Sequence, residues 1–566
     1  MTSERKSIRK SKLAFLSLAL LGACTASEVS NTQQTISASA KTTEAPTVSL
    51  DIMRNITRTL SLDEFEGRAP GSMGEEKTLA LLTAEFAKAG LKPGNGDSWF
   101  QDVPLVGITA ENVAPLEVAS DSNSTSYAYG SQMVIGSYRE QPNISINDSP
   151  LVFVGYGINA PERNWNDYAG IDVTGKTVLI LVNDPDFGTE SLTGPFGGSA
   201  MTYYGRWTYK YEEAARQGAV AALIIHDTAP AAYGWNVVES SWTGAQFFAK
   251  SADGGADQTA ANGWIQKSVA QEILRAGGKD LTTLMAAARE PGFTSVALPL
   301  KASVSFDNKI ETLQSKNVLG ILEGANRPDE YVIYTAHWDH LGRCKPAPDG
   351  DDICNGAIDN ATGTAALVAL ADAHARAGAA DRSLLFLAVT AEESGLLGSK
   401  FYADNPVYPL NQTVGGVNMD ALLMAGAARD VIVVGKGKSE LDGYLDRALA
   451  GLGRVSKAEP TPEKGFYYRS DHFSFAKRGV PMIYFEGGED LIDGGVEAGS
   501  AAALDYTKNR YHGPKDEFDP DWDWSGAEAD LKLYYSVARA LAETDDWPNW
   551  NEGDEFRAIR DASRSR

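Results

Sequence analysis

Histidines and carboxylates follow apolar runs of the second half of the chain. One such run spans residues 331–336 and another spans 384–390, and a third ends just before residue 420. The side chains that follow these runs are those of His337, Asp339, His340, Glu392, Glu393 and Asp420. Imidazole and carboxylate groups are ligands that zinc accepts in open catalytic sites. The sequence therefore predicts a metal site.

Asp359 lies between two glycines in the stretch 356–363, at the expected start of a helix. Hydrolysis of an amide needs a nucleophile and stabilisation of an oxyanion, and two metal ions about 3.5–4 Å apart can supply both. Such a pair needs a bridging carboxylate, for which Asp359 is well placed. It also needs a second imidazole, which must come from later in the chain, at His472 or His512.

These motifs resemble those of the co-catalytic di-zinc aminopeptidase family, which includes bacterial leucyl aminopeptidases, aminopeptidase Y and glutamate carboxypeptidase. The similar stretches occur in the family's order, at 336–340, 356–363, 391–395, 418–420 and 511–516. A further stretch, 62–68, resembles an N-terminal motif of the family. The resemblance implies a zinc-dependent exopeptidase that hydrolyses bonds at the N-terminus of peptide substrates.

The resemblance also implies a role for each residue at two zinc ions per chain. His337 and Asp420 would hold one zinc, His512 and Glu393 the other, and Asp359 would bridge them. Glu392 would be the general base. The remaining roles are supporting ones: Asp339 would orient a ligand imidazole, His340 would lie behind the ligands or line the pocket, and Tyr511 would help to stabilise the oxyanion.

Other functions remain open on the same scaffold. The alternatives are a carboxypeptidase, a dipeptidase, a one-zinc glutaminyl cyclase and an inactive binding protein. The chain has neither the G-x-S-x-G motif of a serine hydrolase nor the H-E-x-x-H motif of thermolysin-type enzymes. Neither of these two hydrolase classes is therefore expected.

The elements around the motifs predict an α/β fold with a mixed, largely parallel sheet between helices. From residue 315 strands alternate with helices, and the continuous apolar run at 384–390 is typical of a strand buried on both faces. In such sheets ligands bind beyond the carboxyl ends of the strands. The catalytic domain is predicted to be discontinuous, at 49–128 and 307–550, followed by a charged and mobile tail at 551–566.

Residues 129–306 have a different pattern, in which short apolar strands alternate with turns rich in Gly, Asn and Asp. The stretch 166–176 resembles part of the protease-associated domain. We therefore predict a smaller, β-rich α/β insert of that type.

The N-terminus predicts export. Basic residues precede an apolar run at 13–23, which is too short to span a bilayer and ends at Cys24. This pattern resembles a bacterial lipoprotein signal at 1–23, with Cys24 as the lipidated residue and a flexible tether at 24–48. The alternative is an ordinary cleaved signal. The expected location is the cell envelope or periplasm of a bacterium, with the lipid as the only membrane anchor, or the exterior.

Length, charge and cysteines agree with an exported protein. The chain has 566 residues, enough for two or more cores, and a net charge of −24, which argues against nucleic acid as a partner. Beyond Cys24 only Cys344 and Cys354 remain. In an oxidising compartment these two could form a disulfide; the alternative is a metal-binding cysteine.

Overall fold

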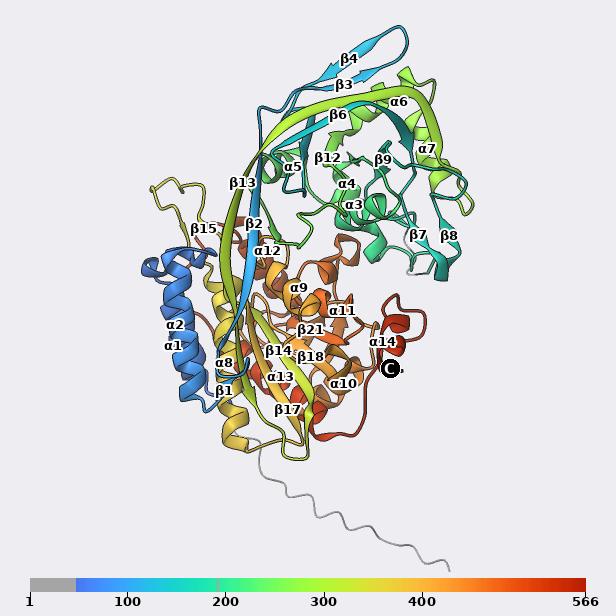
Figure 1. The fold of residues 1–566 in the computed structure, drawn as a ribbon. Coiled ribbons are helices and arrows are strands. Elements are labelled where there is room, and N and C mark those ends of the chain that lie inside the picture. Colours follow the sequence, from blue (N-terminus) through green and yellow to red (C-terminus); the bar gives the residue numbers. More distant parts are fainter. Residues whose placement is uncertain (1–46, 190, 192, 566) are drawn as a thin grey trace, which may run out of the picture. The chain divides into compact units, whose positions relative to one another are not determined.

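The computed structural model describes residues 47–189, 191 and 193–565, all of which belong to one compact unit, 46–566. The predicted signal, Cys24 and nearly all of the predicted tether lie outside the described residues. We divide the described chain into a main lobe, residues 47–111 and 307–565, and an insert lobe, residues 112–306 (Figure 1).

A parallel sheet forms the centre of the main lobe. Four neighbouring strands run parallel, in the order β17 (Arg382–Val389), β14 (Arg327–His337), β18 (Thr413–Asn418) and β21 (Met482–Gly487). Antiparallel neighbours extend the sheet on both sides. They are β13 (Val296–Leu322) beside β17, and β19 (Asp430–Val433) beside β21, with β20 (Val455–Ala458) parallel to β19. The predicted mixed, largely parallel sheet is confirmed.

Helices cover both faces of this sheet because side chains alternate along each strand. Val332, Tyr334 and Ala336 of β14 point to one face, where they share a core with residues of five helices. These helices are α1 (Leu50–Leu60), α2 (Met73–Lys88), α8 (Gly363–Ala377), α10 (Leu441–Leu452) and α13 (Ser525–Glu543). On the other face Tyr331 and Ile333 pack with α9 (Leu397–Asp404) and α11 (His472–Ala476).

The first two helices begin at serine side chains. Ser49 accepts a hydrogen bond from the Ile52 amide at the start of α1, and Ser72 accepts one from the Glu75 amide at the start of α2, each at 3.3 Å. Each bond satisfies one of the N–H groups that a helix N-terminus leaves without a partner inside the helix. The stretch 62–68 forms the turn before α2, and Arg68 at its end donates hydrogen bonds to segments of the site described below.

The insert lobe has its own group of parallel strands, joined to the main sheet through β13, and its own cores. Strands β6 (Asn143–Phe153), β9 (Thr177–Leu181), β10 (Ala221–His226) and β12 (Ala261–Gln266) pair in parallel in that order, and β5 (Met133–Gly136) pairs antiparallel with β12. Helices α3 (Trp207–Arg216), α6 (Lys267–Ala276) and α7 (Leu281–Ala288) contribute to its cores. The lobe is thus α/β with short strands.

Two long strands connect the lobes (Figure 1). Strand β13 pairs with β6 at its start, with β2 (Phe100–Glu111) in its second half, and with β17 at its end. The next strands, β3 (Leu116–Ala119) and β4 (Ser124–Tyr127), pair with each other, and their apolar residues join the insert core. The insert lobe therefore begins earlier in the chain than the predicted residue 129.

The C-terminal tail is ordered, unlike the mobile tail expected from its charge. Residues Arg557–Arg564 form α14, and the buried Arg560 donates a hydrogen bond to the carbonyl of Val414 at 2.9 Å. An aromatic contact between Phe556 and Trp550 also ties the tail to the main lobe. Within the described part of the chain, none of the helices combines the length and apolar character that a membrane span requires.

Candidate metal centre

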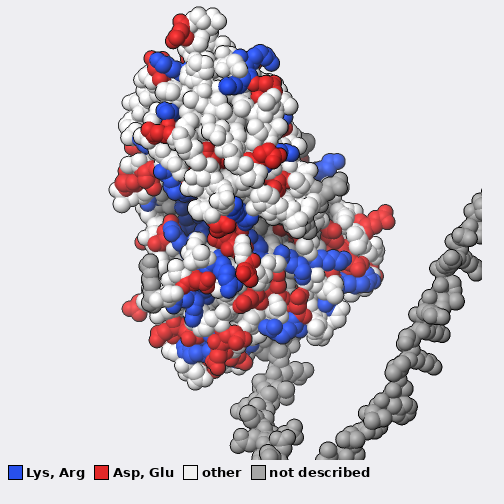
Figure 2. All heavy atoms as spheres, turned by 90° about the vertical axis from the view of Figure 1, so that its right-hand side faces the viewer, with Lys and Arg blue, Asp and Glu red and all other residues white. Residues whose placement is uncertain are grey.

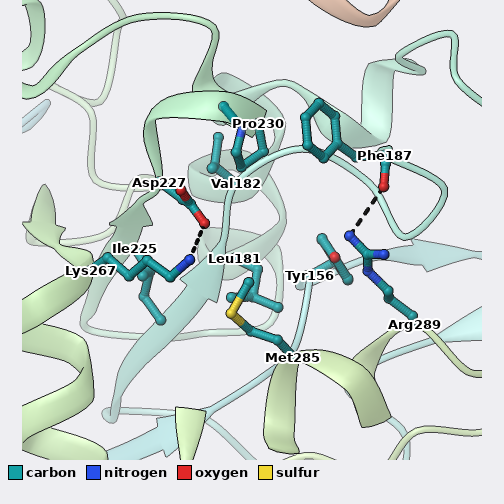
Figure 3. A pocket seen from close by; sticks show the side chains of 11 residues that line it. Tyr156, Leu181, Val182, Phe187, Ile225, Asp227, Pro230, Lys267, Met285 and Arg289 are labelled. Carbon is teal, nitrogen blue, oxygen red and sulfur yellow. Dashed lines mark hydrogen bonds and ion pairs between the residues drawn. The ribbon is translucent and has the colours of Figure 1, made fainter. Parts of the chain in front are cut away.

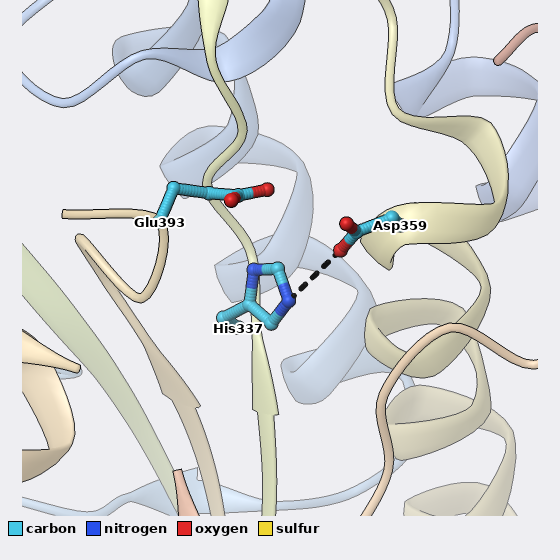
Figure 4. A group of neighbouring side chains, drawn as sticks. All are labelled: His337, Asp359 and Glu393. Atoms are coloured by element: carbon cyan, nitrogen blue, oxygen red, sulfur yellow. Dashed lines mark ion pairs between the residues drawn. The ribbon is translucent and has the colours of Figure 1, made fainter. Parts of the chain in front are cut away.

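The carboxyl ends of the parallel strands bring the predicted ligands together. Strand β14 ends at His337, the turn that holds Glu393 follows β17, and Asp420 follows β18. Because these strands are neighbours and parallel, their ends meet at one edge of the sheet. A π-helical turn, Ala357–Thr362, places Asp359 opposite them, as Figure 4 shows for three of these residues.

Asp359 lies between two imidazoles, with one carboxylate oxygen toward each. Its Oδ1 is 3.2 Å from Nε2 of His337, and its Oδ2 is 3.3 Å from Nε2 of His512. Each imidazole nitrogen also faces a second carboxylate. Asp420 Oδ1 is 3.1 Å from His337 Nε2, and Glu393 Oε2 is 3.1 Å from His512 Nε2. The result is two groups, each of one imidazole and two carboxylate oxygens, that share Asp359.

The carboxylates dominate the electrostatics of the two imidazoles. Burial lowers the pKa of His337, but the charges of Asp420 and Glu392 outweigh it and raise the pKa well above its usual value. His512 shows the same competition: burial lowers its pKa, and Glu393 and Asp359 raise it, to about 10. Without a metal ion, a proton on each imidazole would offset part of the negative charge of the site.

Glu392 differs from its neighbour Glu393. Burial, together with the charges of Asp420 and Glu393, raises the pKa of Glu392 well above its usual value, although the charge of His337 opposes this. Burial and the charge of Asp359 also tend to raise the pKa of Glu393, but the imidazoles of His340 and His512 lower it to about 2. One glutamate is therefore poised to hold a proton and the other to stay ionised.

Asp339 and His340 support the predicted ligands from behind. The main-chain oxygen of Asp339 is 3.1 Å from His337 Nδ1, and its Oδ1 accepts a hydrogen bond from the Glu392 amide at 3.1 Å. His340 Nδ1 lies 2.5 Å from Glu393 Oε1. Both residues are buried. Each of the two residues thus contacts the side chain of a predicted ligand, a position from which it could fix the direction of that side chain.

Asp516 holds the turn of Asp359, a role that the sequence analysis did not assign. Its two carboxylate oxygens accept hydrogen bonds from the amides of Ile358 at 2.9 Å and Asp359 at 3.1 Å. Tyr506 donates a third hydrogen bond to Asp516 at 3.2 Å. Burial raises the pKa of Asp516, and the two backbone amides oppose this. The feature of the sequence that could have indicated this role is the position of Asp516 in the motif 511–516, four residues after His512.

Arg68 is a second supporting residue without a predicted role. Its buried guanidinium donates to the carbonyls of Trp338, Asn355 and Gly356, at 2.6–2.9 Å. It therefore connects the segment after His337 to the segment before Asp359. Burial lowers the pKa of Arg68 to about 10, with nearby carboxylates opposing the shift. The stretch 62–68 was noted only as a resemblance.

The two candidates for the second imidazole, His472 and His512, have different surroundings in the structure. His512 faces Asp359 and Glu393, whereas His472 lies among aromatic rings, 4.6 Å from Tyr467 and 5.2 Å from Tyr484 between centroids. Tyr511 is half-exposed and stacks on His512 at 3.8 Å. Burial, together with the charges of the carboxylates in the site, raises the pKa of Tyr511 well above its usual value. The Tyr511 hydroxyl therefore stays protonated.

Cys344 and Cys354 form a disulfide in the structure, with their Cα atoms 5.9 Å apart. The loop it closes lies between His337 and Asp359 in the chain. Its two ends pair as the short strands β15 (Gly342–Arg343) and β16 (Ile353–Cys354). The cysteines are therefore not available as metal ligands.

The residues of the site fit zinc. Among the described residues, His337, Asp359 and Glu393 each present a ligand atom within 4.8 Å of the others. Imidazole nitrogen and carboxylate oxygen are ligands that zinc accepts. The buried carboxylates also need positive charge, because burying ionised groups without compensation is costly.

A separate pocket lies in the insert lobe, beyond the carboxyl ends of β9 and β10 (Figure 3). It has a volume of about 130 Å³ and a largely apolar lining. Its two cations already have partners: Lys267 pairs with Asp227 at 2.5 Å, and Arg289 donates to the carbonyl of Phe187 at 3.1 Å. No imidazole is among its lining residues, so it is not part of the candidate metal centre.

Sequence comparisons find relatives of part of this chain. Leupeptin-inactivating enzyme 1 of Streptomyces exfoliatus is 30% identical over 200 residues, which cover 35% of this chain and 39% of that protein. Aminopeptidase NAALADL1 of Mus musculus is 33% identical over 146 residues, 24% of this chain and 18% of that protein. The chain thus spans less than half of the length of these relatives.

A solved structure, the aminopeptidase from Aneurinibacillus sp. strain AM-1, aligns with 88% of this chain and 95% of its own, at 20% identity and a TM-score of 0.48. Residues 317–536, which contain all five predicted ligands, match the sequence profile of peptidase family M28. This part of the chain is a peptidase family M28 domain.

Proposed function

We propose that the protein is a zinc-dependent aminopeptidase with two zinc ions per chain. The observation that supports this most directly is the placement of Asp359, whose two oxygens face two separate imidazole–carboxylate groups. His337 and Asp420 would hold one ion, His512 and Glu393 the other, and Asp359 both. A one-zinc cyclase would leave one of these groups without a purpose.

The chain's own residues supply the proton transfers and the orientation of the substrate. Bound zinc ions lower the pKa of water and polarise a carbonyl. Glu392 is the half-buried carboxylate beside the ligands, and as the base it would accept a proton from water and deliver it to the leaving amine. The protonated hydroxyl of Tyr511 is available to donate a hydrogen bond to the developing oxyanion.

The test is a panel of amino-acid anilides and N-terminally blocked, C-terminally free dipeptides, assayed before and after chelation and after zinc is restored. An aminopeptidase releases the coloured amine from anilides, loses this activity with chelator and regains it with zinc. Cleavage of C-terminally free, N-terminally blocked peptides alone would identify a carboxypeptidase instead. No cleavage of either group by the zinc-loaded protein would refute the proposal.

We also propose that the protein is exported and attached to a bacterial membrane by lipid at Cys24. The disulfide between Cys344 and Cys354 supports an oxidising compartment. Cells fed a radiolabelled fatty acid should label the protein, and Cys24→Ser should abolish the label. Unlabelled, secreted protein would indicate an ordinary cleaved signal.

A further inference from the structure

Two arginines at the junction of the lobes have no negatively charged partner. Arg206 lies at the start of α3 in the insert lobe, and Arg469 lies just before α11 in the main lobe. In both, the buried Nε atom has no hydrogen-bond partner among the described residues. In the described part of the chain, neither guanidinium belongs to an ion pair, although the protein carries a net charge of −24.

Contacts between the lobes bring the two segments together. The amide of Met201 donates to the carbonyl of Pro462 at 3.1 Å. The ring of Tyr203 lies 6.2 Å from that of Tyr468 and 5.0 Å from that of Phe473. Arg206 follows Tyr203 by one turn, and Arg469 directly follows Tyr468. The two cations thus extend from adjoining turns of different lobes.

The surroundings of both arginines disfavour their charged forms. Burial and then the charge of Arg469 lower the pKa of Arg206 to about 10. Burial also lowers the pKa of Arg469, and the groups that oppose this are Tyr233 and Tyr511 rather than carboxylates. Like charges placed together in a partly buried position repel each other. An anion between them would remove that cost.

Arg469 connects this pair to the candidate metal centre. The next residue, Ser470, donates a hydrogen bond to Oδ2 of Asp420 at 2.6 Å. Tyr511, which raises the pKa of Arg469, stacks on His512. By contrast, Lys477 of the same junction pairs with Glu212 at 2.9 Å, and Figure 2 shows basic and acidic side chains intermixed over one face of the main lobe.

We infer that Arg206 and Arg469 together bind a carboxylate of the peptide substrate. This inference rests on the proposed peptidase function and names its preferred substrates, peptides with a free carboxylate close to the cleaved bond. Two guanidiniums suit this group because their planar N–H groups match the two oxygens of a carboxylate. The carboxylate is either that of the C-terminus of a short peptide or that of an acidic side chain.

The experiment compares three substrates of the zinc-loaded, full-length protein: trialanine, trialanine amide and Ala-Glu-Ala amide. The variants are Arg206→Gln, Arg469→Gln and the double variant. The matched control is Arg478→Gln, because Arg478 already pairs with Asp404. We expect the wild type to favour a carboxylate-bearing peptide over trialanine amide by about 10- to 100-fold in kcat/KM, as expected for one charge-assisted interaction.

Either arginine variant should lose this preference while still cleaving trialanine amide, and the control should keep it. A preference for trialanine identifies the C-terminal carboxylate, and a preference for Ala-Glu-Ala amide identifies the side chain. Equal cleavage of all three peptides by the wild type would overturn the inference. So would arginine variants that slow all three by the same factor.

A binding measurement separates this inference from the proposed function. In zinc-loaded Glu392→Gln, calorimetry should show that trialanine or Ala-Glu-Ala amide binds more tightly than trialanine amide, and that Arg469→Gln removes the difference. If the wild type cleaves none of the peptides, the peptidase proposal fails, and this titration still decides whether the arginines bind a carboxylate. Equal binding of all three peptides would refute the inference that Arg206 and Arg469 bind a carboxylate.

Discussion

Asp516→Asn tests whether the turn of Asp359 is held by a charged side chain. The carboxylate of Asp516 accepts one amide N–H on each oxygen, from Ile358 and Asp359. An asparagine amide can accept only one of them and would direct its own N–H₂ toward the other. Since a hydrogen bond to a charged group contributes about 1.5–3 kcal/mol, the variant should lose about that much stability.

The same change should weaken metal binding, because the displaced amide belongs to the residue proposed to bridge the two ions. Outer partners of metal ligands typically change affinity by about 10- to 100-fold when mutated. The assay is zinc affinity by competition with a chromophoric chelator, together with urea unfolding of the metal-free protein. Glu517→Gln is the control, because this neighbouring side chain is exposed.

The two readouts separate positioning from general destabilisation. We expect the variant to need about 10- to 100-fold more free zinc for half-saturation, under conditions in which it remains folded. A variant that loses stability but binds zinc as tightly as the wild type would show that Asp516 does not position Asp359. Unchanged stability and unchanged affinity would refute the geometry of the turn.

Three further predictions concern catalysis, pH and the disulfide. Glu392→Gln should retain both zinc ions by elemental analysis and lose about 100- to 10,000-fold in kcat; loss of a metal ion instead would make Glu392 a ligand. Burial lowers the pKa of His374 and His472 to about 3, below the 6.5 of the unfolded chain. As the pH falls, the unfolded state therefore binds protons before the folded state does. The free energy of unfolding should decrease by about 1.4 kcal/mol per pH unit for each of the two histidines between pH 6.5 and 3. The variant His374→Asn should reduce this slope, and an unchanged slope would contradict a buried, neutral His374. Replacing Cys344 and Cys354 by serine should cost about 2–3 kcal/mol of stability, from the entropy of the closed loop; a double variant as stable as the wild type in urea would refute this.

The sequence predicted the residues that meet at strand ends. His337 and Asp420 follow apolar runs, and in a parallel sheet that position alone brings them to one edge. His512 could not be placed in this way, because it lies in a loop far along the chain, and only the family resemblance favoured it over His472. In the structure His512 faces Asp359, whereas His472 lies beside Tyr467 and Tyr484.

Other features depend on contacts that no local pattern encodes. Arg68 and Asp516 form hydrogen bonds with backbone groups that are distant in sequence, so the residues next to them in the chain do not predict these bonds. Arg206 and Arg469 come from different lobes, and the segments that carry them touch only in the folded protein. Arg560 lies in a charged tail, yet it is buried and donates a hydrogen bond to the carbonyl of Val414.

The central claim is that two metal ions share Asp359, and the most direct test is the number of zinc ions per chain. Elemental analysis of the zinc-reconstituted wild type, after removal of loosely bound metal, should give two. His512→Ala should lower the value to one, because His337, Asp420 and Asp359 still form a complete group. A wild type that binds only one zinc ion, or a His512→Ala variant that keeps both, would contradict the account.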